Sequence, residues 1–206
     1  MNSEWKWVRC DEFIDFNPKE TLKKGTISKK VAMENVLPHQ KYVNSYTIDK
    51  YNGGSKFRNN DVLFARITPC LENGKTSQIN FLEENEIGFG STEFIILRNK
   101  DNISDISYIY YLAISNIFRN QAIKSMTGTS GRQRVQIDSL KSLEIKIPPL
   151  TIQKKISAIF SNIDNKIEVN KKINKNFIVL LVIYLFLLTL ILVIKYLVIF
   201  LRTLFL

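Results

Sequence analysis

Residues 145–174 read "IKIPPLTIQKKISAIFSNIDNKIEVNKKIN" and change character at their two prolines. Before Pro148 the residues alternate between apolar and polar, which predicts a β-strand over residues 143–147. After Pro149 the chain has no Gly or Pro through residue 177, and Thr151 is a suitable N-cap behind the prolines. These features predict one long amphipathic helix, residues 150–176, of the coiled-coil type.

The apolar face of this helix repeats at a four-three heptad spacing, with Lys166 and Asn170 at the two polar positions of the seam. Such a face either packs on its own domain or pairs with a second long helix. The length of the helix favours pairing, and the two polar positions would weaken it but fix its register. The residues expected to pair are Ile152, Ile156, Ile159, Ile163 and Ile173.

The chain ahead of this helix predicts a mixed, β-rich domain over residues 1–149, so the fold class is α+β. We expect one helix over residues 105–124, capped by Ser104 or Asp105, and a short helix or turn at residues 138–142. A Gly-x-Gly loop is expected at residues 88–90. Expected strands are residues 4–10, with Trp5 and Trp7 in the core, and residues 31–36, 61–67, 94–97 and 143–147.

The segment "DVLFARI", residues 61–67, has a strand-like alternation that places Val62 and Phe64 on one face and Leu63 and Ala65 on the other. A Thr-Pro pair ends it, and "LENGK", residues 71–75, is typical of a tight turn.

The charge of the 206-residue chain is strongly basic, with a formal net charge of +10. Residues 1–176 hold 27 basic and 19 acidic residues, a net charge of +8. This balance favours a polyanionic partner, either a nucleic acid or an anionic membrane surface.

The candidate chemical groups argue against an enzyme or a metal protein. Cys10 and Cys70 form no metal-binding pattern, and no apolar signal core precedes them, so we expect reduced cysteines in a cytoplasmic domain. His39 is the only histidine, and the chain has no cofactor fingerprint and no set of nucleophile, base and acid. We expect no catalytic residues, no metal and no directly bound cofactor.

The loop "MTGTSGRQRV", residues 126–135, is the first candidate for contact with DNA. Hydroxyls, free backbone N–H groups and guanidinium groups bind phosphates, and an amide can pair with a base edge. The alternative is a solvated turn in which the glycines reverse the chain. The candidate residues are Thr127, Thr129, Ser130, Arg132, Gln133 and Arg134.

A second set of candidates flanks the 61–67 strand and the start of the 94–97 strand, where basic and hydroxyl side chains meet turns. Solvated surface is the alternative for these residues too. Glu93 could accept a hydrogen bond from cytosine N4, but a structural role at the strand start is favoured, because a carboxylate repels phosphate. The candidates are Lys56, Arg58, Arg66, Asn73, Lys75, Ser91 and Thr92.

The C-terminal segment, residues 177–206, is almost entirely apolar apart from Thr189, Lys195, Arg202 and Thr203. Its length suits a membrane span, with the lysines before it on the cytoplasmic side. An alternative is that the segment is the out-of-frame end of a gene. The codons for "NKKINKN" nearly all begin with AA, such DNA is prone to slippage, and T-rich triplets encode Leu, Ile, Val and Phe.

Four segments together resemble the specificity subunit of type I restriction-modification systems. They are "KFRNNDVLFARITPCLENGK", "GFGSTEFIILR", "MTGTSGRQRV" and the Pro-Pro-Leu start of the long helix with the residues that follow it. The resemblance covers residues 1–176 in order, and "PPL-x-x-Q-x-x-I" is its most specific part.

The resemblance implies a non-catalytic protein that recognises double-stranded DNA. Members usually carry two target recognition domains, each followed by a long helix, and each domain reads one half of a split site. They hold methyltransferase (M) subunits, which use S-adenosylmethionine, and restriction (R) subunits join these. This chain has one such domain and one helix, which implies a half-length or truncated subunit that pairs with a second copy or second half through the helix. The alternative is a membrane-anchored protein whose soluble domain binds another ligand.

Overall fold

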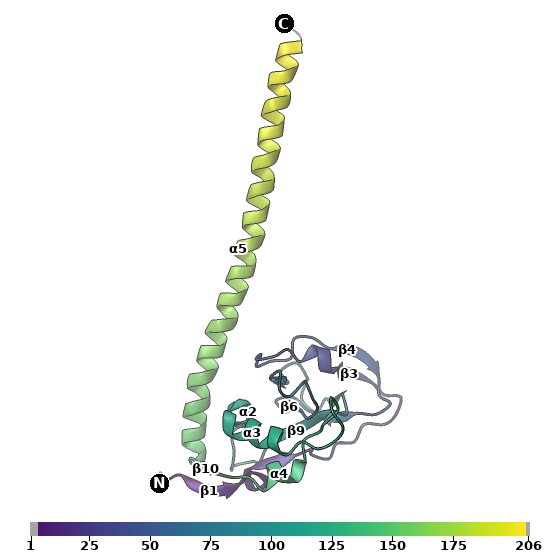
Figure 1. Ribbon diagram of the computed structural model, residues 1–206, viewed down its shortest axis with the longest axis vertical. Coiled ribbons are helices and arrows are strands. Elements are labelled where there is room, and N and C mark those ends of the chain that lie inside the picture. Colours follow the sequence, from purple (N-terminus) through teal and green to yellow (C-terminus); the bar gives the residue numbers. More distant parts are fainter. Residues whose placement is uncertain (1–3, 205–206) are drawn as a thin grey trace. The chain divides into compact units, whose positions relative to one another are not determined.

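The computed structural model describes residues 4–204, with side chains through residue 193 (Figure 1). Two compact units are present, Met1–Ile159 and Phe160–Leu206. The first unit contains all the strands described, and the second continues the C-terminal helix. The α+β class and the long helix predicted from the sequence are confirmed.

The first unit is built around a four-stranded antiparallel sheet in the order β2-β9-β6-β7. Val62 and Phe64 of β6 pack in one apolar cluster, whereas Leu63 packs in another on the opposite face. All four residues of β6 are buried, so both faces of the sheet are covered. The strands are β2 (Ile14–Phe16), β6 (Val62–Ala65), β7 (Thr76–Gln78) and β9 (Phe94–Asn99).

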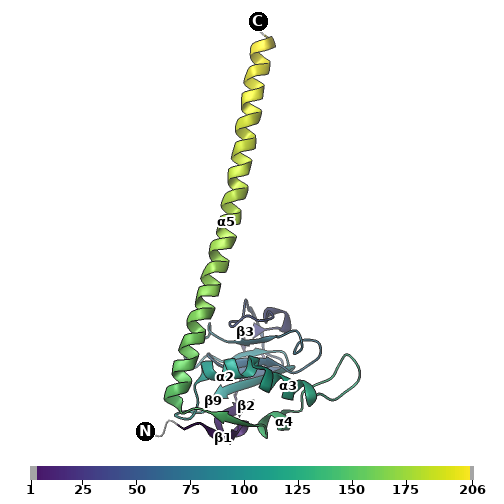
Figure 2. The same ribbon diagram turned by 60° about the vertical axis from the view of Figure 1, so that its left-hand side comes forward.

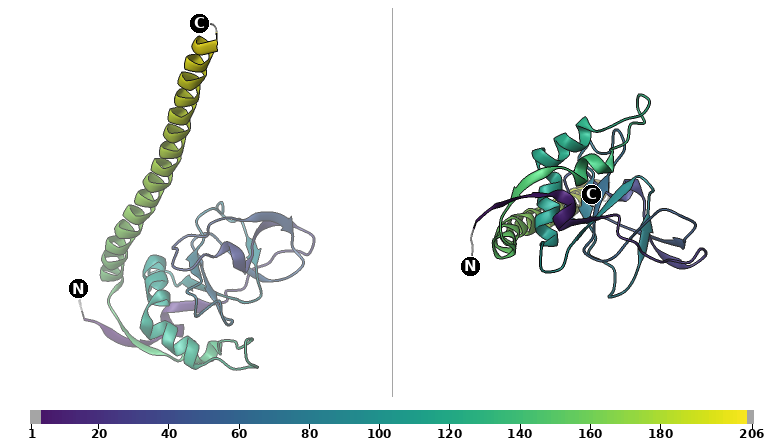
Figure 3. Two further views of the ribbon diagram at one scale, coloured as in Figure 1. Left: turned by 45° about the horizontal axis from the view of Figure 1, so that its top comes forward. Right: turned by 90° about the horizontal axis from the view of Figure 1, so that it is seen from below.

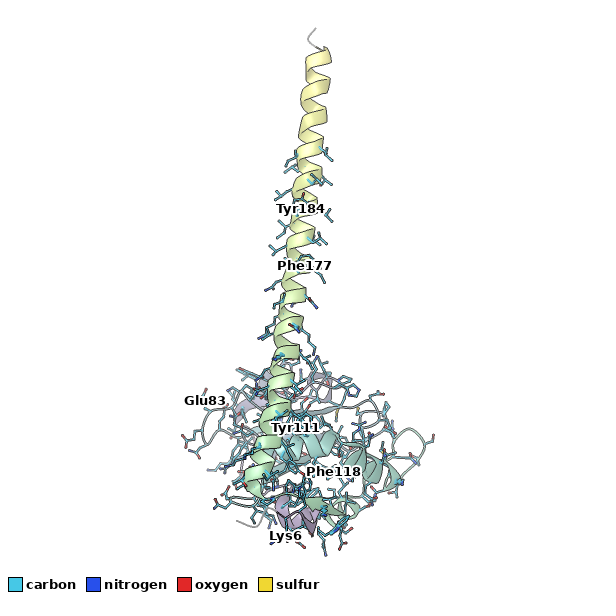
Figure 4. All side chains as sticks on the ribbon, turned by 90° about the vertical axis from the view of Figure 1, so that its left-hand side faces the viewer. Lys6, Glu83, Tyr111, Phe118, Phe177 and Tyr184 are labelled. Carbon is cyan, nitrogen blue, oxygen red and sulfur yellow. The ribbon has the colours of Figure 1, made fainter. Side chains whose placement is uncertain are left out.

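Helices cover one face of this sheet (Figure 1). Phe118 is fully buried and meets the ring of Phe64 edge-on, with 5.4 Å between the ring centres. Figure 4 labels Phe118 and Tyr111 in this layer. The helices are α1 (Cys10–Phe13), α2 (Ile106–Ile114), α3 (Asn116–Lys124) and α4 (Ile137–Lys141).

A second four-stranded sheet, in the order β4-β3-β8-β5, covers the opposite face. Phe57 and Val31 from this sheet pack on Leu63, Phe94 and Ile96 of the central sheet. The result is three layers, of helices, central sheet and second sheet. The elements are β3 (Ile27–Val31), the 3₁₀ helix η1 (Met33–Asn35), β4 (Thr47–Lys50), β5 (Ser55–Phe57) and β8 (Gly88–Gly90).

Three predictions about single elements were wrong. Residues 88–90 form a strand, because a Cβ on Gly90 would overlap the carbonyl oxygen of Val31 and glycine allows the two strands to approach. Residues 31–36 are a strand end and a 3₁₀ turn. The expected 105–124 helix is broken at Ser115, whose extended backbone ends α2 and caps α3. The predicted cap at Asp105 is confirmed, since its carboxylate accepts from the N–H of Tyr108.

A separate two-stranded ribbon pairs the first described strand with the strand that precedes the C-terminal helix. Its strands are β1 (Lys6–Arg9) and β10 (Glu144–Ile147), which pair antiparallel. Trp5 is 46% exposed and Trp7 69% exposed, so their placement in the core was wrong. The alternation itself was right, but Val8 faces the apolar cluster and the tryptophans lie on the open face.

The helix after the prolines is α5 (Leu150–Leu204), and Gln153 fixes its first turn. This side chain is 1% exposed. Its amide nitrogen donates to the carbonyl oxygens of Pro148 at 2.9 Å and Ile103 at 3.3 Å, and its oxygen accepts from the N–H of Asp105 at 3.0 Å. The glutamine of the Pro-Pro-Leu motif therefore ties the start of α5 to the start of α2.

The residues expected to pair along α5 differ in exposure. Ile152 and Ile156 are half-buried, whereas Ile159, Ile163 and Ile173 are about half exposed or more. The described side chains from residue 177 to residue 193 are also exposed, and Figure 4 shows them around the helix at Phe177 and Tyr184. Within the part of the chain searched, α5 is long and apolar enough to cross a membrane by length and composition alone.

Candidate functional site

The loop between α3 and α4 projects from the first unit (Figures 2 and 3). Its base is closed by two backbone bonds between Thr127 and Arg134, of 3.0 and 2.8 Å. Gly128 and Gly131 have positive φ and turn the chain. The loop is therefore a small hairpin that holds the hydroxyls of Thr129 and Ser130 and the guanidinium of Arg132 in solvent, where these side chains are exposed.

The base of this loop is bonded to the end of β6. The N–H of Val135 donates to the carbonyl oxygen of Arg66 at 2.9 Å. The N–H of Gln133 donates to the hydroxyl of Thr68 at 3.0 Å, and the N–H of Thr68 donates back to the carbonyl oxygen of Gln133 at 3.1 Å. Because the segment before β9 also bonds to β6, through Arg66 N–H and Glu93 C=O at 2.9 Å, three distant segments meet here.

The Arg134 guanidinium bonds to the Glu93 carboxylate. The Nη2–Oε1 distance is 2.6 Å, and Nε lies 3.0 Å from both carboxylate oxygens. The hydrogen bond to Glu93 raises the pKa of Arg134 above its ordinary value, and the charge of Glu93 adds to this. The Glu93 carboxylate therefore orients Arg134, a candidate DNA-contacting residue, and this contact is its structural role.

Arg66 lies beneath the loop rather than on the surface. Its side chain is half-buried, and Nη2 donates to the carbonyl oxygen of Val135 at 3.3 Å. Its Nε is buried and has no hydrogen-bond partner among the described residues. Arg66 thus supports the loop from below and adds positive charge at its base.

The other candidates are distributed over two places. Asn73 and Thr92 are exposed and Ser91 is half-buried, and all three lie in segments that flank the loop base. Lys75 donates to the carbonyl oxygen of Met33 at 2.8 Å. The predicted DNA-contacting residues remain predictions, and the structure brings only part of the set together.

Lys56 and Arg58 belong to the second place, on and after β5. The Lys56 ammonium lies 5.8 Å from the centre of the Tyr51 ring, a cation–π distance. The Arg58 guanidinium is held by Glu20, with Nε–Oε1 at 2.6 Å and Nη2–Oε2 at 2.8 Å. Arg58 therefore has a structural partner that its sequence neighbours did not suggest.

This pair is part of a buried ion network that the sequence analysis missed. Arg98 bonds Glu20 at 2.7 Å and bonds both carboxylate oxygens of Asp61 at 2.7 Å. Burial alone would raise the pKa of Glu20, but hydrogen bonds from Arg58 and Arg98 and their charges hold it below its ordinary value. No local signal marks the network, because its members are separated by up to 78 residues.

Comparisons with known proteins agree on one family. A family model described as "Type I restriction modification DNA specificity domain" matches residues 2–176. The chain is 28% identical to the type I restriction enzyme EcoAI specificity subunit of Escherichia coli over 77% of this chain and 28% of that protein. It is 27% identical to the MjaVIII specificity subunit of Methanocaldococcus jannaschii over 82% of this chain and 38% of that one.

Solved structures share the fold. The crystal structure of an HsdS subunit from Thermoanaerobacter tengcongensis has a TM-score of 0.66 at 19% identity, and the match covers 84% of this chain and 45% of that one. The chain therefore spans less than half the length of these relatives. At this identity, the structural match supports the fold and not the details of the site.

Proposed function

The chain belongs to the type I restriction-modification DNA specificity family, and we propose that it recognises double-stranded DNA as one target recognition domain of a specificity subunit. The family match over residues 2–176 is the observation that carries the proposal. Because that match contains both the β-rich domain and the start of α5, it supports a specificity subunit in which the domain and the helix act together.

The protruding loop is the proposed contact surface. Arg132 is exposed, and no hydrogen bond or ion pair of its guanidinium is found among residues 4–193. It is therefore free to neutralise a phosphate, which positions a protein on DNA without reading its sequence. Residues 1–176 carry a net charge of +8, which favours binding to the phosphate backbone.

The partners follow from the family. In this proposal the chain reads one half of a split site and binds methyltransferase subunits, which hold S-adenosylmethionine, and restriction subunits bind to that complex. A second copy, or a second half-subunit, supplies the other half-site through α5. The exposed isoleucines Ile159, Ile163 and Ile173 support this pairing, because an isolated helix with such a face would leave it in water.

The test is DNA selection by the full chain, purified in mild detergent together with its methyltransferase subunit. Duplexes randomised over the binding region are bound, recovered and sequenced, and the methylated site is mapped. We expect a split sequence with two identical, inverted halves. A complex that binds DNA with no sequence preference would refute the proposal.

A matched pair of variants tests the contact surface. Arg132→Ala removes an exposed cation from the loop, and Lys24→Ala removes one from an exposed turn outside it. We expect Arg132→Ala to weaken binding to every sequence and Lys24→Ala to leave it almost unchanged. Equal effects would show that the loop is not the contact surface.

A cytoplasmic location goes with this function. The alternative of a membrane-anchored protein with another ligand rests on the composition of α5 and finds no support in the relatives found. Detergent-free fractionation of cells checks this point, because the family role requires the chain in the soluble fraction with its methyltransferase partner.

A further inference from the structure

The Arg134 guanidinium is held along one edge and open along the other. Glu93 accepts from Nε and Nη2, the two nitrogens that form the side edge of the fork. The end edge, formed by Nη1 and the outer N–H of Nη2, makes no hydrogen bond among the described residues. The Arg134 side chain is 45% exposed, so that edge is accessible from solvent.

The backbone that supports this side chain is fixed from several directions. Arg134 makes both of its backbone bonds with Thr127, and Val135 is bonded to Arg66. Glu93 is fixed as well, since its N–H donates to the hydroxyl of Ser91 at 3.1 Å and its carbonyl accepts from Arg66. Arginine loses much rotamer freedom when it binds, and a fixed arginine has less of it to lose.

We propose that Arg134, oriented by Glu93, is a specificity-determining residue that reads a guanine in the major groove with the open edge of its guanidinium. The inference rests on the proposed DNA-binding function and adds a base to it. Guanine presents two acceptors, N7 and O6, at the spacing of two guanidinium N–H groups, and arginine bonds to both. No other base presents two acceptors side by side in that groove.

The Glu93 carboxylate favours a base over a phosphate as the ligand of Arg134. Glu93 neutralises the charge of Arg134 and would repel a phosphate placed nearby, because like charges disfavour each other. A guanine edge is neutral and needs donors in a fixed direction, which the pair supplies. Arg132 has no carboxylate partner in the described part of the chain and is the proposed phosphate contact, so the loop divides positioning and base reading between two arginines two residues apart.

The test measures base preference position by position for the full chain with its methyltransferase subunit, using randomised duplexes. We expect one guanine in the wild-type half-site to lose its preference by roughly tenfold or more in Arg134→Ala, with the other positions unchanged. Arg132→Ala is the matched control, and it should lower affinity for all sequences while every preference is retained.

The Glu93→Gln variant distinguishes a role in orienting Arg134 from a purely structural role of Glu93. Without the carboxylate, Arg134 gains freedom and an unbalanced charge. The variant should therefore lose preference at the same guanine and show a steeper salt dependence, by about one phosphate contact. A purely structural Glu93 would lower stability or affinity without moving preference at one position.

A chemical probe keeps the test independent of how the variants fold. A duplex with 7-deazaguanine at the position in question lacks the N7 acceptor. The wild-type protein should bind this duplex roughly tenfold more weakly than the normal duplex, whereas Arg134→Ala should bind the two duplexes equally well. If removal of N7 has no effect at any guanine, or if Arg134→Ala weakens all sequences equally, the inference is refuted while DNA recognition stands. If the wild type shows no sequence preference, the proposed function fails and the inference falls with it.

Discussion

Replacement of Asp61 by alanine removes a central member of the buried ion network. Asp61 is 1% exposed and lies where the loop before β6 meets β9. Its carboxylate accepts two hydrogen bonds from Arg98 and one from the backbone N–H of Arg58, all at 2.7 Å. Asp61→Ala therefore leaves a partly buried guanidinium and a backbone donor without these acceptors.

The expected loss of unfolding free energy follows from what stays behind. Removal of one partner from a buried ion pair costs about 3–5 kcal/mol, chiefly because the other charge is left uncompensated. Arg98 keeps its bond to Glu20, and its side chain is 23% exposed. Since both facts reduce the penalty, we expect a loss of about 3 kcal/mol, the lower end of that range. Burial raises the pKa of Asp61 while the bonds from Arg98 oppose this shift, so the pair is tested at neutral pH.

Asp49→Ala is the matched control. Asp49 also accepts from a side-chain cation and from a backbone N–H, each at 2.8 Å, but its side chain is 49% exposed. An exposed pair is worth less than about 1 kcal/mol because water solvates both ions. Urea unfolding of the full chain, followed by near-ultraviolet circular dichroism, measures both variants. Losses that agree within about 0.5 kcal/mol would refute the argument that burial makes the difference.

Four further changes test other parts of the structure. Glu20→Gln should destabilise the protein at neutral pH, because the lowered pKa of Glu20 adds stability while the group is ionised. The difference from wild type should shrink as the pH falls below 4.5, the ordinary pKa of Glu, and thermal unfolding at a series of pH values measures this. Gly90→Ala should cost about 1–3 kcal/mol in urea unfolding, because the added Cβ overlaps the Val31 carbonyl oxygen, and an unchanged stability would contradict that close approach. Gln153→Ala should cost about 1–3 kcal/mol and speed hydrogen exchange at the start of α5, since buried backbone groups lose their partner; unchanged exchange there would count against the role given to this amide. Arg132→Ala should reduce the slope of log affinity against log salt by about one phosphate contact, and an unaltered slope would remove Arg132 from the interface.

The periodic elements could be predicted because their signal is local. The strand at residues 61–67 was assigned from alternation, and Val62 and Leu63 do pack in different clusters on the two faces. The helix after Pro149 was assigned from its heptads and the absence of breakers. In both segments the burial pattern repeats within a few residues, so the order of apolar and polar side chains along the chain predicts it.

Alternation does not record which face is inside. Trp7 in β1 and Trp5 just before it are exposed, whereas Val8 packs on the core, because β10 is the one described strand that pairs with β1 and the other face of that ribbon is open. Gly88 and Gly90 look like a loop in the sequence. They form a strand because a neighbouring strand and the Phe57 ring approach too closely for any side chain.

The sequence by itself determined the fold class, the long helix, the basic charge and the family resemblance, since each depends on composition, on spacing within a segment or on short motifs in order along the chain. Only the tertiary structure decided which charged groups act together. Glu93 meets Arg134 from 41 residues away, and Arg98 meets Asp61 from 37 residues away. Such pairs are set by how strands are ordered in a sheet, and a single sequence contains no periodic signal for that order.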